Sequence, residues 1–117
     1  MATVTSSRDL PHPSLEEIRL ESVLHALADP IRMRMVRDLA TTDGGMSCSA
    51  FDVPVSASTA TYHFRVLRES GVIRQAYKGT AKVSWLRQDD LAKLFPGLLD
   101  SMVEASTRQS GRLGEAS

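Results

Sequence analysis

The stretch that most constrains this chain is Ser56 to Gly71, which is typical of a helix with a defined start and end. Ser56 is a favourable N-cap because its hydroxyl can accept from the free N–H groups of the first turn. Gly71 is a favourable terminator because glycine adopts a left-handed turn without strain. Between them Ala60, Phe64 and Leu67 recur at i, i+4 and i+7, so they share one face. The helix therefore needs a core against which this face packs.

The opposite face of this helix is polar and rich in hydroxyl groups. It carries Ser58, Tyr62, Arg65 and Glu69, with Thr61 at its edge. Such a face suits the major groove of DNA, where these side chains can meet base edges and phosphates. The alternative is an amphipathic helix with a solvated polar face, and this stretch alone does not separate the two.

The residues before this helix predict two longer helices and a short one. A Ser-x-x-Glu capping box predicts a helix that begins at Leu15 and continues to Leu27, and Asp29-Pro30 predicts the next, which ends near Ala40. Residues 46–51 allow two helical turns at most, and residues 52–55 form a turn. A short helix, a tight turn and a longer helix are typical of a helix-turn-helix unit.

The residues after Gly71 predict a hairpin and a final helix. Two strands, 72–77 and 80–86, flank a tight turn at Lys78-Gly79, and such a hairpin is called a wing. Asp89 is expected to cap the last helix, which Pro96 divides or kinks. The predicted fold is mainly α, of the α+β class: a winged helix-turn-helix with a two-stranded wing and N- and C-terminal dimerisation helices. Residues 1–13 are expected to be a flexible arm, 14–107 the domain, and 108–117 a flexible tail.

Charge and composition narrow the functional class. The net charge is zero, but residues 29–88 carry a net +4 and each flanking segment −2. A basic middle favours local anion binding, although so small an excess also arises by chance. The single cysteine, Cys48, fits a reducing cytoplasm, and an apolar run long enough for a membrane span is absent from the sequence.

Three motifs resemble the ArsR family of bacterial winged helix-turn-helix transcriptional regulators. They are Leu27 to Val36, Ser56 to Arg68, and Glu69 to Ile73. The resemblance covers about residues 14–105. It implies a homodimer built from the first and last helices, and a recognition helix in the major groove of each half of a palindromic operator. It also implies a repressor whose promoter binding is typically relieved by an inducer, here an unidentified small molecule.

The sequence departs from the metal-sensing members of that family. Those members carry paired cysteines on the short helix, or Asp/His and Glu/His ligands on the last helix. Here Cys48, His12, His25 and His63 have no spacing that indicates a four-ligand site, so we predict no metal and no cofactor, with a site shared across the dimer left open. Nucleophile and phosphate-loop motifs are also missing, and we predict that the protein is not an enzyme.

Two sets of functional residues follow. The predicted DNA-binding set is Ser56, Ser58, Thr59, Thr61, Tyr62, His63, Arg65, Arg68, Arg74, Lys78 and Lys82. The predicted dimer interface is Leu20, Leu24, Leu27, Leu94, Phe95, Leu98, Leu99 and Met102. His63 has packing as its alternative role, and Trp85 is expected to pack the wing on the core. The competing function is a protein-interaction module on a winged-helix scaffold that no longer reads DNA.

Overall fold

Helices α2 and α3 begin where the sequence supplies caps. The carboxylate of Asp29 accepts from the backbone N–H groups of Ile31 and Arg32 at 2.8 and 3.1 Å, and α2 spans Pro30–Ala40. The hydroxyl of Ser56 accepts from the Thr59 N–H at 3.2 Å, and α3 spans Ala57–Glu69. Gly71 follows with a φ of 90°. The predicted bounds of these two helices are confirmed.

The computed structural model describes residues 7–115. Its other elements are β1 (Ser7–Asp9), the 3₁₀ turn η1 (Leu15–Glu17), α1 (Leu20–Leu27), β2 (Met46–Ser47), the 3₁₀ turn η2 (Cys48–Ala50), β3 (Ile73–Lys78), β4 (Ala81–Leu86), α4 (Gln88–Leu94) and α5 (Leu98–Leu113). The strands form one antiparallel sheet in the order β1-β3-β4-β2.

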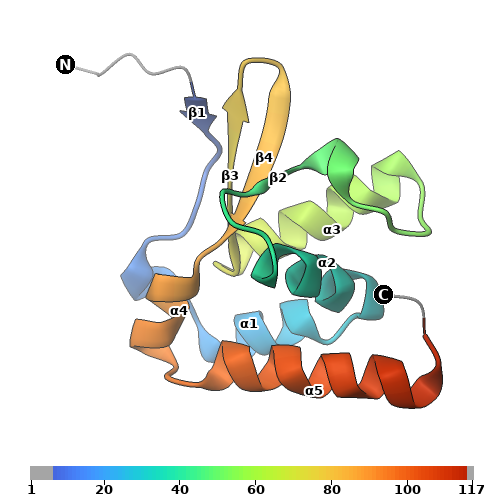
Figure 1. The fold of residues 1–117 in the computed structure, drawn as a ribbon. Helices are drawn as coiled ribbons and strands as arrows, with labels where there is room; N and C mark the ends of the chain where they lie inside the picture. The colour runs from blue at the N-terminus through green and yellow to red at the C-terminus, as the bar shows by residue number, and fades with distance from the viewer. Residues whose placement is uncertain (1–6, 116–117) are drawn as a thin grey trace.

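The β3–β4 hairpin projects from the helices as a wing, while α5 lies along the opposite side of the molecule (Figure 1). The α2–η2–α3 unit followed by this hairpin is a winged helix-turn-helix, as predicted. The wing is wider than the expected two strands, because β1 pairs with β3 and β2 pairs with β4. Within residues 7–115, the helices lack the length and apolar character needed to cross a membrane.

The core lies between the helices and the base of the sheet. Phe64 and Leu67 of α3 are buried in it together with Met35 and Val36 of α2, and Ile73 adds the base of β3. The apolar line read from the sequence of α3 is therefore its inner face. Because this face is fixed, the polar face of α3 is held in one orientation relative to the wing.

The first helix begins later than the capping box predicts. The box is present at Ser14 and Glu17, but only the turn η1 follows it, and Ile18 is extended before α1 begins at Leu20. The extended residue directs the Ile18 side chain into the core. There it faces Gly71, where an added Cβ would lie 2.6 Å from Ile18 Cγ1. A second reason for glycine at this position is therefore close packing.

Three other predicted boundaries are wrong. Residues 46–51 do not form a two-turn helix, because the backbones of Met46 and Ser47 pair with Ser84 and Val83 of β4, leaving one 3₁₀ turn. Helix α4 has Arg87, not Asp89, at its N-cap position. The third is the start of the tail, because α5 remains helical to Leu113, past residue 108. Pro96-Gly97 does separate α4 from α5, as predicted.

The predicted N-terminal arm is also partly structured. Residues 7–9 form a strand on the wing, and His12 and Pro13 accept hydrogen bonds from Gln75 and Arg87. The part of the arm before residue 7 lies outside the described residues.

We predict that Phe64→Ala destabilises the domain by about 3–5 kcal/mol, the usual cost of truncating a buried phenylalanine. Phe64 meets Phe51 edge to face, with ring centroids 5.1 Å apart, so the substitution also removes an aromatic pair. Denaturant unfolding followed by circular dichroism measures the change. Tyr62→Ala, on the exposed face of the same helix, is the control. Equal losses in the two variants would contradict the assigned faces of α3.

Candidate nucleic-acid interface

The outer face of α3 presents a group of exposed polar side chains. Ser58, Thr59, Thr61, Tyr62 and Arg65 are all exposed, and 48% of Tyr62 is accessible. The guanidinium carbon of Arg65 lies 5.7 Å from the centre of the Tyr62 ring. Within residues 7–115, neither Tyr62 nor Arg65 forms a side-chain hydrogen bond. Both polar groups are therefore free to bind a partner.

The hydroxyl groups near the start of α3 serve mainly the helix itself. The Ser56 hydroxyl accepts from the Thr59 N–H and lies 3.3 Å from the Ser58 hydroxyl. The Thr61 hydroxyl donates to the Ala57 carbonyl at 2.9 Å. These bonds fix the side chains and leave lone pairs on their oxygen atoms for a donor.

His63 points into the protein, although it was predicted among the DNA-binding residues. Only 7% of it is exposed, and its Nδ1 lies 3.1 Å from Nη1 of Arg32, which is itself 5% exposed. A guanidinium can only donate, so Nδ1 accepts and the ring proton is on Nε2. His63 therefore ties α3 to α2 and has no place on the outer face.

Arg68 also turns inward, and this second member of the DNA-binding set is displaced from the outer face. Its Nη1 donates to Oε1 of Gln75 at 2.7 Å, and the Gln75 amide donates to the Ser84 hydroxyl at 3.0 Å. The same amide nitrogen lies 3.8 Å from Sγ of Cys48. Gln75 and Ser84 are fully buried, so this chain of contacts joins α3, the two wing strands and η2.

Cys48 belongs to this packing arrangement. Burial raises the pKa of its thiol, while the charge of Lys82 and the Ser84 hydroxyl act in the opposite direction. A higher pKa leaves less thiolate at neutral pH and makes the sulfur less reactive. The geometry fits the interpretation of Cys48 as a small packing residue. Within residues 7–115, groups of three or more His, Cys, Asp or Glu side chains placed to hold a metal ion are absent.

The three predicted wing cations lie on two different sides of the sheet. Arg74 and Lys78 lie over the Trp85 ring, 4.5 and 5.1 Å from its centre. Lys82 lies on the other side, 5.8 Å from the centre of the Tyr77 ring. Trp85 is half-buried on the wing rather than packed into the core as predicted, because its ring stacks under these cations and against Gly45.

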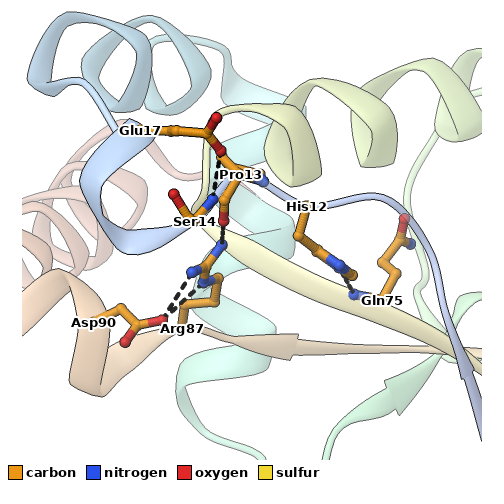
Figure 2. Close-up of polar contacts among 7 residues, drawn as sticks. All are labelled: His12, Pro13, Ser14, Glu17, Gln75, Arg87 and Asp90. Carbon is orange, nitrogen blue, oxygen red and sulfur yellow. Dashed lines mark hydrogen bonds and ion pairs between the residues drawn. The ribbon is translucent and has the colours of Figure 1, made fainter. Parts of the chain in front are cut away.

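The segment before α1 runs along the edge of β3 that faces away from β4, an arrangement that was not predicted (Figure 2). The Gln75 N–H donates to Nε2 of His12 at 2.8 Å, and the Leu10 N–H donates to the Gln75 carbonyl at 3.1 Å. Arg87 donates from Nη1 to the Pro13 carbonyl at 2.8 Å and pairs with Asp90 at 2.9 Å. The imidazole of His12 thus replaces a backbone acceptor, which periodicity cannot indicate.

The pKa of His12 is lowered from its ordinary value. Burial is the main cause, the charge of Asp9 opposes it, and the cations Arg87, Arg68 and Arg74 lower the pKa further. A neutral imidazole is what the bond from Gln75 requires, because a protonated Nε2 cannot accept.

We predict that acid weakens the attachment of residues 10–13 to β3. The folded chain has the lower His12 pKa, so the unfolded chain takes up this proton first as the pH falls. The stability from His12 is then complete above its ordinary pKa of 6.5 and declines as the pH falls from there through the lowered value. The protection factor of the Gln75 amide in hydrogen exchange, measured from about pH 7.5 to about pH 5, should fall with the pH. His12→Gln should remove the dependence and His25→Gln should keep it. A protection factor of the Gln75 amide that does not change with pH in the unaltered chain would contradict the assigned bond.

The predicted dimer residues divide into exposed and buried groups. Leu20 and Leu24 of α1 are 43% and 39% exposed. Leu27 and Leu99 are buried inside the protomer, which contradicts their predicted place on a dimer surface. Partly buried residues that pack against the core make up the rest: Leu94, Phe95, Leu98 and Met102.

Two comparisons with known proteins agree with this geometry. Residues 27–76, from the end of α1 into β3, match a family model described as a helix-turn-helix domain. The chain is also 29% identical over 89 residues to YceK of Bacillus subtilis (strain 168), described as an uncharacterized HTH-type transcriptional regulator. That match covers 74% of this chain and 88% of the relative. Both similarities agree with the helix-turn-helix unit of the fold, and the ArsR assignment is a proposal.

Proposed function

We propose that this protein is a sequence-specific DNA-binding transcriptional regulator of the ArsR type, a homodimeric repressor at palindromic operators in the bacterial cytoplasm. The observation that carries the proposal is the outer face of α3. It combines exposed hydroxyl groups with Tyr62 and Arg65, whose side chains form no hydrogen bonds within residues 7–115, on a helix whose other face is fixed in the core. A rigid helix with such a face can enter a major groove.

Each side chain of the proposed interface has a distinct part. Arg65 donates two hydrogen bonds to one guanine, and Tyr62 and Ser58 contact neighbouring base edges. The first turn of α3, with Thr59 and the Ser56 cap, binds a phosphate through its free N–H groups. His63 and Arg68 are not part of this interface, because both hold α3 from behind. Their contribution is to fix the angle at which α3 meets DNA.

A protein-interaction module is the second candidate, favoured by the zero net charge and the single arginine on the outer face of α3. Salt dependence separates the two functions. Binding to DNA releases counterions, so log affinity falls linearly with log salt, by about 0.9 for each phosphate neutralised. A protein partner with a neutral contact surface would show a much shallower slope.

We predict that Arg65→Ala costs about 1–3 kcal/mol of affinity for the operator, the value of a good arginine–guanine contact. The loss on random DNA should be smaller. Fragments selected from genomic DNA by the purified protein supply the operator, and fluorescence anisotropy measures both affinities. Arg108→Ala is the control, since Arg108 lies on α5, away from the wing. Equal losses on both DNAs would make Arg65 a phosphate contact only.

The proposed dimer rests on the apolar surface of the terminal helices. Leu20 and Leu24 expose large apolar side chains on α1, and Leu98 and Met102 are incompletely covered on α5. A symmetric partner that offers the same surface would cover it in an isologous contact. Helix α5 lies opposite the wing (Figure 1), so a dimer formed there leaves α3 and the wing accessible.

We predict that the double variant Leu20→Glu with Leu24→Glu is monomeric at micromolar concentration, as measured by light scattering. Burying four carboxylates in a symmetric interface would be strongly unfavourable. Its affinity for a palindromic site should fall towards that for a single half-site. The matched control, Ser58→Glu with Thr61→Glu, should remain dimeric and lose DNA binding. An unaltered chain that is monomeric would contradict the dimer.

A further inference from the structure

We infer that the N-terminal strand contributes to the DNA-binding surface, with Arg8 and Lys82 forming a phosphate-binding pair on either side of Tyr77. This inference rests on the proposed binding of DNA and extends it to a residue outside the helix and the hairpin. The surface is defined as Arg8, Tyr77 and Lys82, and is called the Tyr77 surface below.

The position of the Tyr77 surface follows from strand alternation. Ile73, Gln75 and Tyr77 point to the same side of β3, because side chains alternate along a strand. Gln75 accepts from Arg68 of α3, so this is the side of the sheet on which α3 lies. Ile73 and Gln75 are covered completely, whereas Tyr77 is only half-buried further along the wing. The Tyr77 surface is therefore the continuation of the side that carries α3.

The two strands beside β3, β1 and β4, each place one cation on this surface. Arg8 of β1 and Lys82 of β4 are the register partners of Tyr77 on its two sides. The Arg8 guanidinium carbon lies 5.5 Å and the Lys82 ammonium nitrogen 5.8 Å from the centre of the Tyr77 ring. Both distances allow the ring to attract the cations and to fix their positions.

The two charged residues of β1, Arg8 and Asp9, lie on opposite sides of the sheet. Asp9, the next residue, pairs with Ala76 in the register and reaches Arg74 at 3.2 Å on the opposite side. The acidic group of β1 thus neutralises a cation that faces away from α3. Among residues 7–115, ion pairs with Arg8 or Lys82 are absent. The side shared with α3 therefore keeps two uncompensated positive charges.

This arrangement suits the phosphodiester backbone of double-stranded DNA. A helix in the major groove brings the neighbouring backbone beside the wing, and a guanidinium binds phosphate oxygens with two parallel bonds. Arg8 can act there only while β1 stays paired. The hydrogen bonds from Leu10 to Gln75, from Gln75 to His12 and from Arg87 to Pro13 hold it in place.

The test measures how the affinity of the full chain for DNA depends on salt. Arg8→Gln should weaken binding to the selected operator and to random DNA by the same factor, and should reduce the slope of log affinity against log salt by about 0.9. Arg8→Lys should keep the slope. Arg19→Gln, which removes one exposed arginine away from the wing, should leave affinity and slope unchanged.

A second variant addresses the same surface without altering β1. Lys82→Gln should lower the slope by a similar amount, and the double variant by about twice as much. Hydrogen exchange of the Leu10 amide should show that β1 remains paired in Arg8→Gln. An unaltered chain without salt-dependent DNA binding would overturn the proposed function itself. DNA binding by the unaltered chain with an unchanged slope in Arg8→Gln would overturn only the role of Arg8.

Discussion

The buried guanidinium of Arg32 is the contact on which the arrangement of the helices depends. It donates from Nε to the Ala26 carbonyl at 2.7 Å and from Nη2 to the His25 carbonyl at 3.2 Å. Both carbonyls belong to the last turn of α1, where carbonyls lack the usual α-helical donors, and the His25 carbonyl also accepts from the Ala28 N–H at 3.2 Å. The third contact, from Nη1, is to His63 of α3. One side chain of α2 therefore satisfies the end of α1 and fixes α3.

This contact lies between the two surfaces that the proposed function uses. Helix α1 carries Leu20 and Leu24 of the proposed dimer surface, and α3 carries the proposed recognition face. A change in the position of α1 would move the acceptors of Arg32 and so disturb the support of α3. The positive charge also favours the C-terminal end of α1, where the helix dipole is negative. The position of the recognition face is thus linked to the packing of α1.

Local signals in the sequence were enough to predict the parts that local chemistry determines. Caps at Asp29 and Ser56, the glycine at 71 and the apolar line through Phe64 define α2 and α3. The alternating residues after Gly71 define the wing. These signals act within a few residues, so they can be read from the sequence without the tertiary structure.

The features that were missed depend on contacts between distant segments. The break at Ile18 is explained by the close packing of its side chain on Gly71, and the inward turn of His63 by Arg32, thirty-one residues earlier. Strand β1 is short and carries Arg8 and Asp9, so it resembles a solvated arm until its pairing with β3 is seen. The sequence predicted which side chains of α3 are exposed, apart from His63 and Arg68. It did not predict which side of the wing each charge faces, because strand register decides this.

The flanking strands also cover the edges of the hairpin. An open hairpin offers unpaired N–H and C=O groups along both edges, and such edges can template pairing with another chain. Here β1 covers part of the β3 edge and β2 part of the β4 edge. The Gln75 peptide illustrates the protection, since the N-terminal segment occupies both its N–H and its C=O. A segment that brings a cation to the wing thereby also leaves less of the sheet edge open to pairing with another copy of the protein.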